Sequence, residues 1–171
     1  MKINSRNDFA DLPWLVGLEL GVSAGEFSRQ LLCPKVDRHW RHLTSIDRWA
    51  DHHDIQQCLR ATELLGEFGR SSAVIRASFS EALPCFEDSH FDFIYIDGYA
   101  HTGQNGGATL RDWWPKLAPG GVFAGHDYDP KYPRTIAAVD EFAADKGLEI
   151  NVTPSGVDRF QSWYIFKGDI G

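Results

Sequence analysis

Short apolar runs alternate with longer amphipathic segments along most of the chain. The short runs predict strands and the amphipathic segments predict helices, because apolar side chains recur with the period of each element. Strands are expected at 15–20, 42–46, 73–76, 91–96 and 122–124, and helices at 26–32, 55–68, 109–117 and 134–146. A helix after nearly every strand predicts a parallel sheet that is covered by helices on both faces.

The last part of the chain breaks this alternation. Strands expected at 148–152 and 161–166 have no helix between them, so they should close the sheet as an antiparallel pair. Upstream, the glycine-rich stretch 103–107 predicts a mobile loop, and 119–121 predicts a turn into the fifth strand. With no repeat or linker, residues 1–171 are expected to form one α/β domain with a doubly wound, mostly parallel, seven-stranded Rossmann-like sheet.

Composition narrows the classes of partner. The formal net charge of -7 disfavours nucleic acid, because phosphates would be repelled, and favours a small-molecule partner. No apolar stretch is long enough to cross a bilayer, and no signal peptide is recognisable, so a cytoplasmic location without membrane partners is expected.

Cysteine and histidine form no clear metal pattern. Cys33, Cys58 and Cys85 contain no CxxC pair and are expected to be reduced, buried thiols. Four histidines cluster between 39 and 53, but no cysteine lies near them at zinc-site spacing. This stretch is interpreted as a solvated connecting segment.

Polar or glycine residues follow all five expected parallel strands. In open sheets of this type, ligands bind beyond the carboxyl ends of the strands, where the strand order reverses. The residues at these ends are Glu19, Gly21 and Gly25, then Asp47, Ser78, Asp97, and His126 with Asp127. Their shared position predicts one ligand site along this edge.

The turn after the first strand reads Glu-Leu-Gly-Val-Ser-Ala-Gly at 19–25. Glycines at 21 and 25 permit a sharp turn and let a ligand approach the backbone closely. The spacing is not the GxGxxG of dinucleotide-binding turns, and the absence of a following Lys-Ser or Lys-Thr pair excludes a P-loop. By itself, GxxxG also fits helix packing.

Asp47 lies about twenty residues beyond this turn, where a carboxylate accepts hydrogen bonds from ribose hydroxyls in nucleoside-binding sheets. Aspartate is also a favoured N-cap, so Asp47 could instead begin the helix after Trp49. The two roles are compatible.

Taken together, these motifs resemble class I S-adenosylmethionine-dependent methyltransferases. Segment 19–25 is similar to that family's first motif, and Ser-Ile-Asp-Arg-Trp at 45–49 to its acidic second motif. Segments 91–98 and 114–128 resemble a bacterial subgroup that includes sugar and natural-product O-methyltransferases. The resemblance covers nearly the whole chain and implies methyl transfer to a small-molecule acceptor, at an oxygen atom.

The resemblance also implies where the cofactor lies. Glu19, Gly21 and Gly25 would hold its methionine half and Asp47 its ribose, while Asp97 would face its amino end or the acceptor. The full set of implied cofactor contacts is Glu19, Gly21, Ser23, Gly25, Asp47, Arg48, Ala77, Ser78, Phe79 and Asp97, of which 77–79 would line the adenine edge.

Methyl transfer to oxygen needs an aligned acceptor and often removal of its proton. The candidate catalytic residues are Asp97, His126 and Asp127, with His126 as the base, although a structural histidine fits equally well. Alternatively, Asp97, Asp127 and Asp129 could hold Mg²⁺, which would lower the acceptor's pKa, as in some members that the chain resembles. Turn formation before Pro130 is the competing interpretation for Asp127 and Asp129.

Two features depart from the subgroup. Tyr-Ala-His-Thr at 99–102 leads into a glycine-rich insertion, and the N-terminal helices that cap the substrate pocket are nearly missing. A homodimer could supply the lid, and either Trp113 or Trp114 could line that contact, since neighbouring residues cannot both face the core from one helix. A non-catalytic binding protein therefore stays open, whereas a nicotinamide-dependent oxidoreductase is disfavoured by the glycine spacing.

Overall fold

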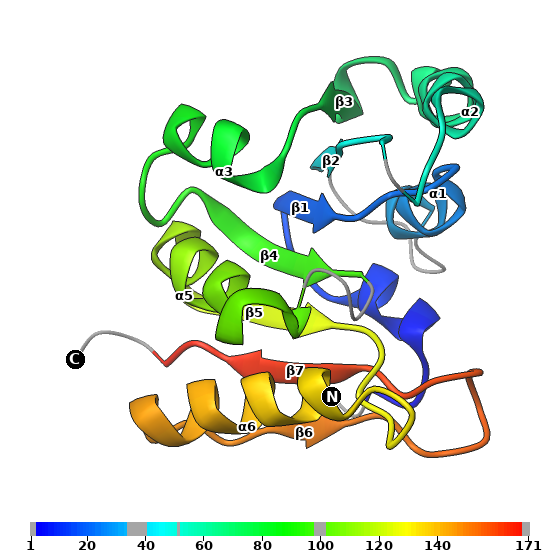
Figure 1. Ribbon diagram of the computed structural model, residues 1–171. Coiled ribbons are helices and arrows are strands. Elements are labelled where there is room, and N and C mark those ends of the chain that lie inside the picture. Colours follow the sequence, from blue (N-terminus) through cyan, green and yellow to red (C-terminus); the bar gives the residue numbers. More distant parts are fainter. Residues whose placement is uncertain (1–2, 34–40, 51, 98–101, 169–171) are drawn as a thin grey trace.

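The computed structural model describes residues 3–33, 41–50, 52–97 and 102–168. Their strands form one sheet in the order β3-β2-β1-β4-β5-β7-β6 (Figure 1). The strands are β1 (Val16–Leu20), β2 (His42–Asp47), β3 (Ser72–Arg76), β4 (Phe91–Ile96), β5 (Leu117–Gly125), β6 (Asn151–Val152) and β7 (Trp163–Phe166). β1 to β5 run parallel, while β7 is antiparallel to β5 and β6. The predicted fold class and the closing antiparallel pair are confirmed.

Helices pack on both faces of this sheet, as Figure 1 shows. One face is covered by η1 (Arg6–Asp11), α1 (Glu26–Leu32) and α2 (Ile55–Gly66), and the other by α3 (Phe79–Ala82), α5 (Ala108–Trp113) and α6 (Pro133–Lys146). Short 3-10 turns are η2 (Gly69–Ser71), η3 (Leu83–Cys85), η4 (Gln104–Gly106) and η5 (Trp114–Lys116).

The central strand β4 divides the apolar core in two. Phe93 and Tyr95 pack with η1, α1 and α2, whereas Ile94 and Ile96 pack with the opposite helices. Successive side chains of a strand point to opposite faces, so an almost uninterrupted apolar run fills both cores. β4 therefore lies in the middle of the sheet, with its carboxyl end fixed between β1 and β5.

A buried arginine attaches the N-terminal segment to this scaffold. Arg41 is 5% exposed, and its Nη1 donates to the carbonyl oxygens of Ala10 (2.9 Å) and Leu31 (3.0 Å). Its guanidinium also lies 4.0 Å from the ring centre of Trp14. These contacts hold the end of η1 against the end of α1, beside the start of β2.

The region before β5 differs from the prediction. The helix expected at 109–117 ends at Trp113, and β5 starts at Leu117, so the residues at 119–121 lie inside the strand instead of in a turn before it. Pro115 has no backbone N–H and cannot continue an α-helix, which explains the change to η5. The glycine-rich stretch, expected as a loop, contains the short helix η4.

Because α5 ends at Trp113 and the 3-10 turn η5 begins at Trp114, the side chains of both tryptophans reach the core. Trp113 is 1% exposed. The Trp114 ring lies 5.4 Å from that of Phe123 and 5.3 Å from that of Phe142. The expectation that only one of the two faces the core is therefore wrong, while a pocket or dimer contact at the half-buried Trp114 stays a prediction.

Two further predictions need correction. The cysteines are free, but Cys33 and Cys85 are exposed and Cys58 is half-buried. The histidine-rich stretch is not simply a solvated connection, because His42 lies in β2 and His53 contacts Asp47; His39 lies outside the described residues.

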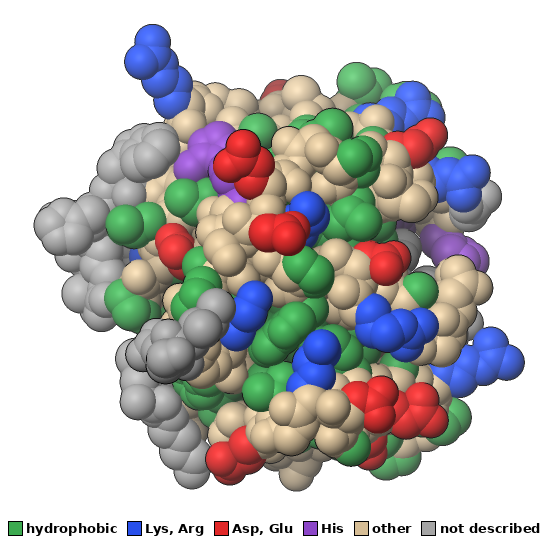
Figure 2. Space-filling view, turned by 90° about the vertical axis from the view of Figure 1, so that its left-hand side faces the viewer, with side chains coloured by type: hydrophobic (Ala, Val, Ile, Leu, Met, Phe, Trp, Pro, Cys, Tyr) green, Lys and Arg blue, Asp and Glu red, His purple; other side chains and the backbone are tan. Residues whose placement is uncertain are grey.

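The surface agrees with the composition in one respect. On the face where the parallel strands begin, Figure 2 shows Lys and Arg side chains interspersed with Asp and Glu, and no basic patch gathers there. None of the described helices is long and apolar enough to cross a membrane.

Candidate active site

The carboxyl ends of β1, β2, β4 and β5 lie side by side. Leu20 pairs with Ile46 and Ile96, and Ile96 pairs with Gly125, so the residues that follow these positions share one edge. The predicted convergence of Glu19, Asp47, Asp97 and His126 on one edge of the sheet follows from this register.

The turn after β1 is sharp, and all of it except Ser23 is buried. Gly21 and Gly25 have positive φ values of 90° and 87°, and Ser23 between them has φ 55°. Gly25 is also the N-cap of α1, where an added Cβ would lie 3.1 Å from the Cα of Ala61. Glycine is thus required at 25 by both conformation and space.

Asp47 fixes this turn from the end of β2. Its Oδ2 accepts hydrogen bonds from the backbone N–H groups of Val22 (2.8 Å) and Ser23 (3.0 Å), and its Oδ1 accepts from that of Trp49 (3.1 Å). Burial raises the pKa of Asp47, but these three bonds and His53 lower it below its usual value. Asp47 does not cap the next helix, because Asp54 is the N-cap of α2.

Other polar groups of this turn are held by residues that the sequence did not indicate. Trp49 is 1% exposed, and its Nε1 donates to the carbonyl oxygen of Ser23 at 2.7 Å. Gln57 donates to the Ser23 hydroxyl at 3.0 Å, and Nδ1 of His53 lies 2.7 Å from Oδ2 of Asp47. Trp49 ends the second motif without a predicted role, and His53 and Gln57 belong to no recognisable motif, so only the folded chain reveals these contacts.

Glu19 is fully buried at the end of β1. The Ser28 hydroxyl, from α1, donates to its Oε2, while Oε1 has no hydrogen-bond partner among the described residues. Burial raises the pKa of Glu19 to about 8, although the Ser28 hydrogen bond and the positive charge of Arg6 lower it. The carboxyl group is therefore largely protonated at neutral pH.

Asp97, His126 and Asp127 meet at the ends of β4 and β5. Nδ1 of His126 lies 3.1 Å from Oδ1 of Asp127 and 3.6 Å from Oδ1 of Asp97. The side chains of His126 and Asp127 are 13% and 10% exposed. The three candidate catalytic residues therefore form one partly desolvated cluster.

Asp97 has a further partner, which the sequence gave no signal to find. Nη2 of Arg6 donates to its Oδ2, although the two residues lie 91 positions apart. An arginine in a segment without a motif cannot be linked to Asp97 before the fold is known.

The three proposed metal ligands, Asp97, Asp127 and Asp129, do not form a metal site among the described residues. Oδ2 of Asp97 pairs with Arg6, and Oδ1 of Asp129 accepts the backbone N–H of Lys131 at 2.9 Å, as a turn-forming aspartate does. Among the described residues, no group of three His, Cys, Asp or Glu side chains could hold a metal ion. These residues therefore do not fit the Mg²⁺ interpretation.

The implied adenine edge has a structural role as well. Ser78 is the N-cap of α3, and its backbone N–H and hydroxyl both donate to Glu81, at 2.9 and 2.6 Å. Arg48 is exposed, and its carbonyl oxygen accepts a hydrogen bond from Arg76 at 3.3 Å. Contacts to a base at 77–79 would therefore rely on the backbone or the Phe79 side chain.

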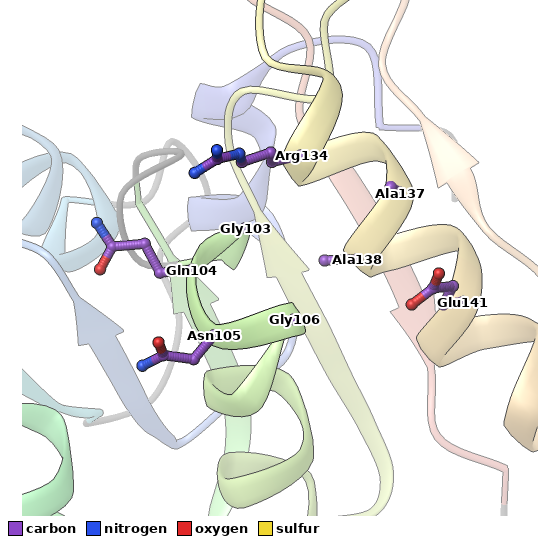
Figure 3. Close-up of a pocket in the computed structure, with 8 residues that line it drawn as sticks. All are labelled: Gly103, Gln104, Asn105, Gly106, Arg134, Ala137, Ala138 and Glu141. Atoms are coloured by element: carbon purple, nitrogen blue, oxygen red, sulfur yellow. The ribbon is translucent and has the colours of Figure 1, made fainter.

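A groove of about 520 Å³ runs between η4 and α6 (Figure 3). It is lined by Gly103, Gln104, Asn105, Gly106, Arg134, Ala137, Ala138 and Glu141. Figure 3 shows Arg134 reaching from the first turn of α6 past Gly103 toward the side on which Gln104 lies. The groove thus carries a cation, an anion and two amides, and its lining suits a polar molecule.

Comparison with known proteins identifies the class. A family model described as a methyltransferase domain matches residues 18–128, from β1 to Tyr128. The uncharacterized protein y4gI of Sinorhizobium fredii is 38% identical over 61 residues, which are 36% of this chain but only 7% of that protein.

Solved structures share the fold at low sequence identity. An O-methyltransferase from Bacillus cereus in complex with S-adenosylhomocysteine gives a TM-score of 0.69 at 16% identity, over 95% of this chain and 78% of that one. The N-methyltransferase NodS from Bradyrhizobium japonicum gives 0.65 at 17% identity, over 96% and 92%. A spermidine synthase gives 0.66 at 18% identity, over 95% and 56%. The shared fold alone therefore does not select the atom that is modified.

The family match covers more than half of the chain and includes the turn after β1, Asp47, Asp97 and the His126–Asp127 pair. These residues are the ones that the sheet brings to a single edge. The chain therefore belongs to the methyltransferase-domain family, whose methyl donor is S-adenosylmethionine.

Proposed function

We propose that the chain transfers a methyl group from S-adenosylmethionine to an oxygen atom of a small polar acceptor, with His126 as the general base. The position of its Nδ1, 3.1 Å from Asp127 and 3.6 Å from Asp97, is the observation that carries the proposal. Carboxylates beside Nδ1 keep the proton on that nitrogen and leave Nε2 to accept one from the acceptor hydroxyl.

The edge between β1 and β2 suits the cofactor. Glu19 offers a buried oxygen without a described partner, and the turn contains glycine at 21 and 25, where no Cβ would keep a ligand from the backbone. Oδ1 of Asp47 accepts one described hydrogen bond, from Trp49, so it retains capacity for a ribose hydroxyl. When bound, the cofactor supplies a methyl group on a positively charged sulfur. These residues hold and orient that group but take no part in bond making.

The acceptor would enter along the groove between η4 and α6. Arg134 lines this groove and lies in the first turn of α6, two residues after Tyr132. The Tyr132 ring lies 5.0 Å from that of Phe160, which in turn lies 6.2 Å from that of His126. These ring contacts link the start of α6, where Arg134 lines the groove, to His126, and they support an acceptor that reaches the base from this side.

The charge supports a small molecule over a nucleic acid as acceptor. The net charge of -7 would repel the phosphates of a nucleic acid. A homodimer and a cytoplasmic location stay predictions from the sequence.

The test replaces His126 by Gln or Ala and measures S-adenosylhomocysteine formation with a panel of catechols, phenolic acids and monosaccharides, with amines as controls. Loss of general-base catalysis should lower kcat by about 10²- to 10⁴-fold. The affinity for S-adenosylhomocysteine should stay within about twofold, because the base does not hold the cofactor.

Treatment with a chelator distinguishes catalysis by a general base from catalysis that depends on a metal ion. Because Asp97 pairs with Arg6, treatment with EDTA should leave the wild-type rate unchanged. Loss of activity with EDTA and recovery with Mg²⁺ would contradict the metal-free base. Turnover only with amines would contradict the oxygen acceptor, and cofactor binding without any turnover would favour a non-catalytic binding protein.

A further inference from the structure

Arg6 lies among the acidic groups at the carboxyl ends of β1 and β4. Its guanidinium carbon is 3.7 Å from the ring centre of Phe27, in α1, and 5.2 Å from that of Tyr95, in β4. The side chains of Arg6 and Asp97, which form an ion pair, are 20% and 26% exposed. The pair is therefore partly shielded from water but still accessible.

The backbone fixes Arg6 independently of its side chain. Its N–H donates to Oδ2 of Asp158 at 2.6 Å, from the segment before β7. The rest of η1 packs on α1, and Phe9 of η1 is fully buried there. A changed side chain at position 6 would thus leave these anchors in place.

Two buried polar atoms near this ion pair lack partners. Nε of Arg6 and Oε1 of Glu19 are both inaccessible, and neither has a hydrogen-bond partner within the described ranges. The two side chains are close enough for the charge of Arg6 to act on Glu19. Guanidinium groups present several N–H donors in one plane, so Arg6 can bind a second carboxylate besides Asp97. These two atoms leave hydrogen-bonding capacity for a ligand beside the ion pair.

We propose that Arg6 binds the carboxylate at the methionine end of the cofactor, while Asp97 receives the neighbouring ammonium group. This inference rests on the proposed function. An α-amino acid is a zwitterion, and an arginine–aspartate pair offers the opposite charge to each of its ends.

The surrounding charges explain why this role needs an arginine. Glu19, Asp97 and Asp127 all lie at this edge, and each would repel an incoming carboxylate when ionised. The described contacts place Arg6 beside Asp97 and Glu19. Its positive charge would offset the repulsion between these acidic groups and the carboxylate of the ligand.

The test compares two ligands that differ only in this carboxylate. Calorimetry measures the Kd of S-adenosylhomocysteine and of S-adenosyl-3-thiopropylamine, its decarboxylated analogue, for the wild type, Arg6→Gln and Arg6→Lys. Arg6→Gln should weaken S-adenosylhomocysteine by about 10- to 100-fold, the range of a charge-assisted pair, and the analogue by less than about twofold. The Kd of S-adenosylhomocysteine for Arg6→Lys should lie between those for the wild type and Arg6→Gln, because lysine keeps the charge but lacks the planar guanidinium group.

The matched control is Arg29→Gln, an exposed arginine in α1, which should change neither Kd. Equal weakening of both ligands by Arg6→Gln would show that Arg6 only holds the segment in place, and unchanged affinity for both would show that it makes no contact. Either result overturns this inference alone. A wild type that binds neither ligand overturns the proposed function and this inference with it. If Arg6→Gln does not fold, Arg6→Lys decides. A greater loss of affinity for S-adenosylhomocysteine than for the analogue supports the inference, and an equal loss overturns it.

Discussion

Several residues that are proposed to bind the ligand also hold the fold together. Asp47 was predicted as a ribose ligand, and its carboxylate also holds the N–H groups of Val22 and Ser23. Buried backbone donors need acceptors whether or not a cofactor is bound, so one side chain supplies them. The sequence shows where an acid stands but not which bonds it makes, and for this reason the roles of Trp49 and Arg6 could not be predicted.

Glu19→Gln should change how stability depends on pH. Folding raises the pKa of Glu19 from its ordinary value of 4.5 to about 8, mainly through burial. Between these values the folded chain binds more protons than the unfolded chain, so the free energy of unfolding falls as pH rises from 4.5 to 8. Glutamine cannot ionise, so the variant loses this contribution.

Urea unfolding of both proteins at several pH values measures the difference. Relative to Glu19→Gln, the wild type should lose on the order of 1 kcal/mol per pH unit across this window. Parallel pH profiles would show that the carboxyl group is not buried as described.

At the scale of elements, helices and strands with a strong apolar periodicity were predicted well, whereas segments with irregular backbone were not. The predicted ranges of α1 and β4 match the observed Glu26–Leu32 and Phe91–Ile96. β5 was predicted too short, because proline and glycine at 119–121 suggested a turn. The strand includes them, with Gly120 at φ 76° and a register shift opposite Phe91 and Phe93, as in a β-bulge. η1 was missed because a short 3-10 helix has little periodicity.

Gly125→Ala should destabilise the end of β5. An added Cβ would lie 2.6 Å from Cζ2 of Trp163 and 2.7 Å from the carbonyl oxygen of Ile96, and backbone cannot move aside cheaply. Overpacking of this kind costs about 1–3 kcal/mol.

Gly66→Ala is the matched control, because nothing lies within 4 Å of its added Cβ at the end of α2. This variant should be neutral or slightly more stable than the wild type. Thermal unfolding of the two variants measures both effects, and equal melting temperatures would argue against the close packing at Gly125.

At the scale of the whole molecule, topology explains why the site was partly predictable. A parallel sheet places the carboxyl ends of β1, β2, β4 and β5 together, so residues that follow those strands converge without detailed side-chain knowledge. Contacts made by residues outside the strand ends could not be predicted from this topology. Arg6 reaches Asp97 across 91 positions and Asp158 across 152, and no local pattern encodes either pairing. Residues 98–101, part of the predicted departure from the subgroup, lie outside the described residues.

The central claim is that the cofactor binds at the carboxyl edge of the sheet, and amide chemical shifts during a titration with S-adenosylhomocysteine test it most directly. Saturable shifts are predicted for the N–H groups of Gly21, Ser23 and Asp97, because their backbone borders the proposed site. Ser89 and Gly120, near the opposite edge, should not shift. Absence of saturable shifts, or shifts confined to that opposite edge, would contradict the account.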